Sequence, residues 1–151
     1  EVLIDSHMML DYLDSLVPAD RRMFPVAEPE RRRALKVAAL ATGLADKALA
    51  LFYERRLHDA VSEVWAGRCR TQLAAGFAAL EADRAKRPGQ WWFGDRIGHA
   101  DIAVTAALRF LRDVHGEAIE LAATPALDHH CRSSEALEVF KAISQPFIPP
   151  T

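Results

Sequence analysis

The sequence lacks most features that would mark a specialised class of protein. Its 151 residues include two cysteines, Cys69 and Cys131, which lie far apart and form no Cys-x-x-Cys motif. That argues against a disulfide scaffold and fits a reducing compartment. The net charge of −2 excludes the basic footprint of a nucleic-acid-binding protein. No apolar run reaches membrane-spanning length and no signal peptide is visible, so we expect a cytoplasmic protein without nucleic-acid or membrane partners.

What the sequence does contain is a large share of helix-forming segments. Half of the residues are hydrophobic and 26% are charged, which is ordinary for one globular domain with a sizeable core. From Glu30 to about Leu57 there is no proline, and alanine and leucine dominate, so we expect one long helix. A second long helix is expected from about Val61 to Lys86. Two long helices joined by a short connection predict an antiparallel hairpin.

The C-terminal half predicts shorter and more buried helices. The segment Ile102–Leu108 is apolar on every side, which is typical of a helix at the centre of a bundle, and Gly116 is suited to end that helix. Thr124-Pro125 predicts the start of another helix, and a last helix is expected over 134–143. The aromatic segment 91–93 is expected to pack against the buried helix.

The first 28 residues differ from the rest of the chain. The apolar run 2–4 is compatible with the end of a buried strand, and apolar residues at helical spacing follow up to Leu16. Three of the eight prolines fall within residues 18–29, which indicates a linker. We therefore divide the chain into the end of a preceding domain (1–17), a linker (18–28) and a helical domain (29–151). Because the chain enters directly on a strand-like segment, we expect further residues to precede Glu1.

The start of the buried helix carries the most informative motif. With Gly98 as the N-cap, Asp101 falls at the third helical position, where its carboxylate can accept a hydrogen bond from the N-cap backbone N–H. Ile97 and Ile102 stand at the positions of a hydrophobic staple. Gly98 has no side-chain oxygen, so this capping box has one arm, and serine at that position would supply the other. His99 is expected to lie on the surface.

This stretch resembles the motif that begins the core helix in the C-terminal domain of glutathione transferases. The family pattern, S/T-x-x-D within G-D-x-x-x-x-A-D-I-A, stands here at 94–103, with Gly98 in place of Ser or Thr. The segment 5–13 resembles E/Q-S-x-A-I-x-x-Y-L, which ends the family's thioredoxin-like domain. The segment 41–56 is similar to a bacterial branch in which A-D-G-x-x-D precedes Y-E-R, with Thr42 in place of Asp. Three motifs in this order make essentially the whole chain similar to bacterial cytosolic glutathione S-transferases.

The resemblance implies an all-α helical bundle preceded by the last strand and helix of a thioredoxin-like domain. It also implies a glutathione site. Ser6 would bind the γ-glutamyl carboxylate through its hydroxyl and backbone N–H at a helix N-terminus, and Asp5 would accept a hydrogen bond from the glutamyl ammonium. The alternative is that Asp5 and Ser6 only cap the helix. No residue matches the family's thiol-activating Ser, Cys or Tyr, so the catalytic residue is expected upstream of Glu1, and the chain as given is expected to be inactive alone.

Other candidate residues have two interpretations. In a glutathione transferase, Phe52 and Tyr53 would line an apolar pocket for the electrophile; otherwise they belong to the helix–helix core. The segment His129-His130-Cys131 suggests a metal site, but adjacent helical residues point about 100° apart and no His-x-x-x-His spacing is present. No metal is therefore expected. Both cysteines are expected to be small buried side chains.

For the whole protein the resemblance implies an enzyme of detoxification. The thiolate of its co-substrate glutathione would attack an electrophilic small molecule, while the helical domain would supply the electrophile pocket and much of a homodimer interface. Gly43 costs about 1 kcal/mol in a helix, so we expect it where two backbones approach closely, at that interface. The alternative is that Gly43 faces a neighbouring helix of its own subunit, or water. The alternative is a non-catalytic binding or assembly module, because similar helical domains also occur in translation and redox-regulatory proteins.

Overall fold

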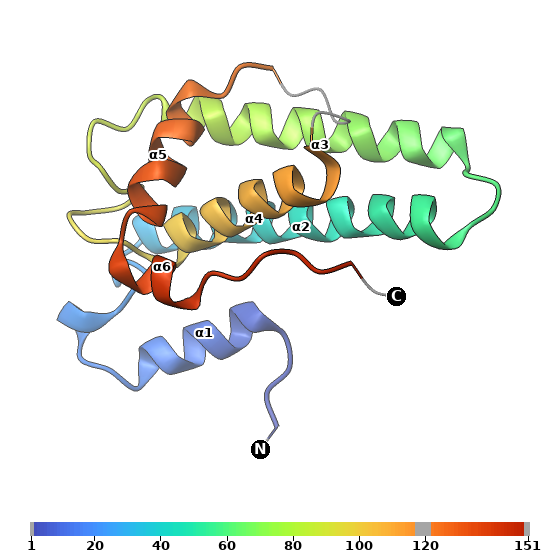
Figure 1. The fold of residues 1–151 in the computed structure, drawn as a ribbon. Helices are drawn as coiled ribbons and strands as arrows, with labels where there is room; N and C mark the ends of the chain where they lie inside the picture. Colours follow the sequence, from blue (N-terminus) through green and yellow to red (C-terminus); the bar gives the residue numbers. More distant parts are fainter. Residues whose placement is uncertain (1, 117–121, 150–151) are drawn as a thin grey trace.

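The computed structural model describes residues 2–116 and 122–149, and every regular element in this part of the chain is helical. The elements are α1 (Ser6–Ser15), the 3₁₀ turn η1 (Ala19–Arg21), α2 (Glu30–Leu57), α3 (Glu63–Arg84), α4 (His99–His115), α5 (Pro125–Glu135) and α6 (Glu138–Ile143). Figure 1 shows α2 and α3 as a long hairpin with α4 packed on α2, and α5 across one end. The all-α class and the hairpin that the sequence predicts are thereby confirmed.

The helix α2 forms one side of the core. Its buried residues recur every three or four positions, as an amphipathic helix requires, and most of them are alanine or another small side chain. These small side chains allow α4 to lie close to α2. The buried residues of α2 are Ala34, Val37, Ala38, Ala41, Leu44, Ala48 and Leu51.

The helix α4 lies at the centre of the bundle, against both α2 and α5. Val104, Leu108 and Leu111 are almost fully buried, and Ala106 alone faces outward within the segment that we expected to be buried all round. Gly116 ends the helix, with φ 53°, as predicted. No helix of the described residues combines the length and apolarity that a membrane span needs.

Two expected elements differ in the structure. Residues 2–4 form no strand and Val2 and Ile4 are exposed, because a strand needs a neighbouring strand to complete its hydrogen bonds and none lies in the described chain. The helix that starts at Pro125 extends through the buried Ser134 to Glu135, so the last helix begins at Glu138 instead of at residue 134.

In the view of Figure 1, α1 lies to one side of the bundle and the tail after α6 passes between the two. The apolar side of α1 is largely exposed, in contrast to that of α2 and α4. Its exposed apolar residues are Met8, Met9, Tyr12, Leu13 and Leu16.

Candidate functional site

The N-terminus of α1 presents an exposed polar corner. Asp5 is the N-cap, and its Oδ1 accepts hydrogen bonds from the backbone N–H groups of His7 (2.8 Å) and Met8 (3.4 Å). Its φ of 74° is unusual for a residue with a side chain, and such strain is common at ligand sites. The exposed Ser6 makes no hydrogen bond to another described residue through its hydroxyl or its backbone N–H. This corner therefore has free donors at the positive end of a helix, where an anion is favoured.

Two polar contacts place this corner beside α2. His7 Nε2 lies 2.6 Å from Thr42 Oγ1, and Arg31 on α2 donates to Asp11 Oδ1 at 2.5 Å. Thr42 is the residue that departs from the bacterial motif, and its hydroxyl serves here to anchor α1.

An apolar pocket of about 310 Å³ lies between α4, α6 and the C-terminal tail. Phe147 from the tail packs edge-on against Phe52 of α2 (ring centroids 5.3 Å apart) and against Phe110 of α4 (5.6 Å). Phe110 and Phe147 line the pocket, together with the buried Thr105. The structure thus joins an apolar cavity to the aromatic end of α2.

The two aromatic residues singled out in the sequence have different positions. Phe52 is half-buried and reaches the pocket through Phe147, whereas Tyr53 is exposed and lies against the Phe52 ring, with centroids 5.6 Å apart. Sequence reasoning missed Phe110 and Phe147. The available signal was the pair Phe147-Ile148 between prolines in an otherwise irregular tail, since an isolated apolar pair there suggests an anchor.

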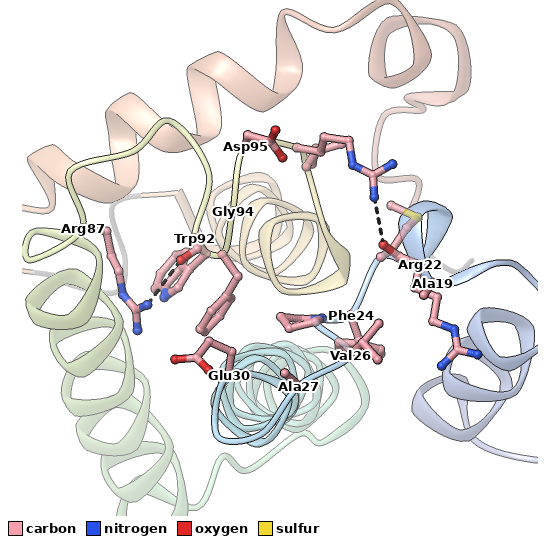
Figure 2. Close-up of a pocket in the computed structure, with 15 residues that line it drawn as sticks. Ala19, Arg22, Phe24, Val26, Ala27, Glu30, Arg87, Trp92, Gly94 and Asp95 are labelled. Atoms are coloured by element: carbon pink, nitrogen blue, oxygen red, sulfur yellow. Dashed lines mark hydrogen bonds between the residues drawn. The ribbon is translucent and has the colours of Figure 1, made fainter.

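A second pocket, of about 570 Å³, lies at the other end of α1, between the linker and the loop before α4. Figure 2 shows Phe24 and Trp92 at this pocket, with the side chains of Arg22, Arg87 and Glu30 around it. The arginines are already engaged: Arg87 binds Asp83 and the Trp92 carbonyl, and Arg22 donates to the Val17 carbonyl. The guanidinium groups of Arg22 and Arg87 are therefore held by other parts of the chain.

The first turn of α4 has the hydrogen bonds that its sequence suggests, and more. Asp101 Oδ2 accepts from the Gly98 N–H, and Oδ1 accepts from the Trp92 N–H, both at 2.8 Å. His130 Nε2 lies 3.3 Å from Oδ1, and Arg84 Nε donates to His130 Nδ1 at 3.3 Å. Burial raises the pKa of Asp101, while these backbone donors and the Arg84 charge act in the opposite direction. The Asp101 carboxylate thus connects the first turn of α4, the loop that contains Trp92, α3 and α5.

Two expectations about this turn are wrong. His99 is buried rather than on the surface, because the linker residues Met23 and Phe24 pack against it. Serine at position 98 would not simply complete the capping box, since a Cβ there would lie 2.6 Å from the Met23 backbone oxygen. Glycine replaces the family's Ser or Thr because the linker backbone occupies that space.

Cys69 of α3 and His130 and Cys131 of α5 are packed in the core. Cys69 and Cys131 are buried and free, and burial raises the pKa of Cys131 to about 11, which removes it as a nucleophile near neutral pH. His130 is fully buried in the polar network, while its neighbour His129 is exposed, as expected for adjacent helical positions. Within the described ranges no three His, Cys, Asp or Glu side chains gather as a metal site would require.

Comparison with protein families gives a match to the model of the glutathione S-transferase C-terminal domain over residues 36–133. The chain belongs to the glutathione S-transferase family. No curated protein sequence matches it significantly. The division at residues 17, 28 and 29 remains a prediction, although the family match lies wholly within the expected helical domain.

Solved glutathione transferases from bacteria have the same fold. One from Pseudomonas fluorescens Pf-5 with bound glutathione is 27% identical, with a TM-score of 0.80 over 97% of this chain and 70% of that chain. One from Methylobacillus flagellatus with glutathione bound is 24% identical, with a TM-score of 0.79 over 93% and 68%. A complex of the Methylobacterium radiotolerans enzyme with glutathione sulfonate is 23% identical, with a TM-score of 0.78 over 99% and 71%.

Proposed function

We propose that this chain forms the helical part of a glutathione transferase, in which the thiolate of bound glutathione attacks an electrophilic small molecule. The observation that carries the proposal is the pair of free donors of Ser6 at the N-terminus of α1, in a chain whose fold matches proteins crystallised with glutathione. In this proposal Ser6 binds the γ-glutamyl carboxylate, and Asp5 accepts a hydrogen bond from the ammonium group.

The electrophile site in this proposal is the apolar pocket at the tail. Phe52, Phe110 and Phe147 supply aromatic faces for an apolar or aromatic electrophile, and Tyr53 lies at the exposed edge. The pocket is small, about 310 Å³, which favours small substrates such as nitroaromatic compounds. Glutathione is the co-substrate, and the chemistry proposed for the pocket needs no metal.

Replacing Ser6 with alanine tests the glutathione contact. In the full-length protein we expect Ser6→Ala to raise the KM for glutathione about tenfold, because a hydrogen bond to a charged group is lost. The measurement is the steady-state conjugation of a nitroaromatic electrophile at varied glutathione. Ser15→Ala, at the exposed opposite end of α1, is the control and should leave the KM within about twofold. An unchanged KM in Ser6→Ala removes Ser6 from the site, and a full-length protein that neither binds glutathione nor conjugates it contradicts the function itself.

We also propose that the protein is a homodimer with α1 and α2 at its interface. Gly43 is exposed in the middle of α2, and a Cβ there would meet no atom of its own chain within 4 Å, so no contact within the subunit explains this glycine. At a two-fold interface it would allow close approach of the partner helix. We expect Gly43→Leu to shift the full-length protein from dimer towards monomer in sedimentation velocity at micromolar concentration. A variant that stays dimeric, with unaltered stability, would place the interface elsewhere.

A further inference from the structure

The buried end of α1 is attached to the linker through one carboxylate. Asp14, in the last turn of α1, is only 7% exposed. Its Oδ1 and Oδ2 each lie 3.0 Å from the Met23 backbone nitrogen, and Oδ2 also accepts from the Phe24 N–H at 2.7 Å. The carboxylate therefore holds the returning linker backbone directly against α1.

The same carboxylate faces the first residue of α4. His99 is 8% exposed, and its Nε2 lies 3.4 Å from Asp14 Oδ1 and makes no hydrogen bond of good geometry to any described residue. Its ring packs against Phe24, with centroids 4.6 Å apart, and its backbone N–H donates to the Met23 carbonyl at 3.2 Å. We call these four residues, Asp14, Met23, Phe24 and His99, the joint between α1 and the bundle.

The joint is the buried polar part of the attachment of α1, and Leu10 of the same helix adds an apolar contact with the core. Two other polar contacts, His7–Thr42 and Asp11–Arg31, lie nearer the N-terminus of α1 and are partly exposed. The Asp11 and Arg31 side chains are 46% and 33% exposed. Polar contacts in water contribute little to a fixed geometry, whereas a buried charge must keep its partners. The joint therefore fixes where α1 lies.

We propose that Asp14 and His99 are positioning residues of the glutathione site: their buried contact fixes α1 on the bundle, so that Ser6 is held where it binds glutathione. This inference depends on the function proposed above. The length of α1 leaves little tolerance for a change in its tilt. Ser6 and Asp14 are eight residues apart, about 12 Å along the helix. A tilt of about 10° at the joint moves Ser6 by about 2 Å, and a misplacement of about 1 Å is already enough to lose a productive contact.

The test compares two histidines on one helix. His99→Phe keeps a ring against Phe24 but removes both ring nitrogens, and Asp14→Asn keeps the shape of the carboxylate but removes its charge. His115→Phe is the matched control, since His115 is equally buried on α4 and its Nε2 contacts the Ala48 carbonyl of α2 instead of the joint. Two readouts are measured on the full-length protein well below its melting temperature: the KM and kcat for glutathione conjugation, and amide hydrogen exchange in α1.

We expect His99→Phe and Asp14→Asn each to raise the KM for glutathione about tenfold with kcat within about twofold, and to speed exchange in α1 about tenfold. His115→Phe should lower the melting temperature comparably, yet leave the KM and α1 exchange unchanged. An unchanged KM in both joint variants, or an equal rise in His115→Phe, overturns the inference. If the wild-type protein binds no glutathione, the proposed function fails separately, and unchanged α1 exchange in His99→Phe then overturns the role of the joint as well.

Discussion

Replacing Asp101 with alanine is expected to lower the free energy of unfolding by about 3–5 kcal/mol, the largest effect that we predict for this chain. The carboxylate is 1% exposed and accepts from two backbone N–H groups on two different segments. Removing it leaves the buried Trp92 N–H and the half-buried Gly98 N–H without a partner, and deprives the buried Arg84 guanidinium of its nearby negative charge. A cap on an exposed helix would contribute only about 1 kcal/mol.

Urea denaturation of Asp101→Ala beside Asp113→Ala measures this effect. Asp113 is an acid on the same helix, but its side chain is 39% exposed and pairs with Arg109 at the surface. Its loss should cost no more than about 1 kcal/mol. Equal losses in the two variants would show that Asp101 acts as an ordinary surface acid, and that the buried network contributes nothing to stability.

Acid is expected to destabilise the protein through His130. Burial, and then the neighbouring Arg84 charge, lower the pKa of this histidine from its ordinary value of about 6.5 to about 4. Arg84 Nε donates to Nδ1, which fits a neutral ring with its proton on Nε2, facing Asp101. Below pH 6.5 the unfolded chain therefore binds a proton that the folded chain excludes.

The sign and size of this effect follow from the linkage of proton binding to folding. With His130 neutral, the folded protein has its full stability above pH 6.5. As pH falls towards 4, protonation of the unfolded chain removes about 3 kcal/mol of the free energy of unfolding. We expect wild type to lose about 3 kcal/mol more than His130→Asn between pH 7 and pH 4, because the variant has no group to titrate there. The exposed neighbour His129→Asn, measured in the same way, should follow the wild-type curve. Parallel stability curves for wild type and His130→Asn would mean that the buried ring is protonated without cost.

Local patterns in the sequence predicted the helices and the cap, because both depend on near neighbours. The absence of proline fixed α2 at Glu30–Leu57, and the three-residue spacing from Gly98 to Asp101 gave the hydrogen bond at the start of α4. The Trp92 N–H, which lies nine residues from Asp101, could not be assigned to the same carboxylate from spacing alone.

Features set by the linker and the tail could not be predicted in this way. His99 is buried, and serine would not fit at position 98, only because the linker backbone at Met23 packs on the first turn of α4. Phe147 reaches Phe52 and Phe110 across about 95 and 37 residues of sequence, a contact that no periodicity signals. For the candidate site, a sequence motif suggested the Asp5-Ser6 corner, whose role stays a prediction, whereas Phe110 and Phe147 of the apolar pocket carried no such motif.

The central claim, that Ser6 at the N-terminus of α1 receives the γ-glutamyl carboxylate, is tested most directly by a pair of ligands. Calorimetric titration of the full-length protein would compare glutathione with an analogue that lacks only this carboxylate. We predict that wild type binds glutathione about tenfold more tightly than the analogue, and that Ser6→Ala removes most of the difference. Equal affinity of the wild-type protein for the two ligands would contradict the account.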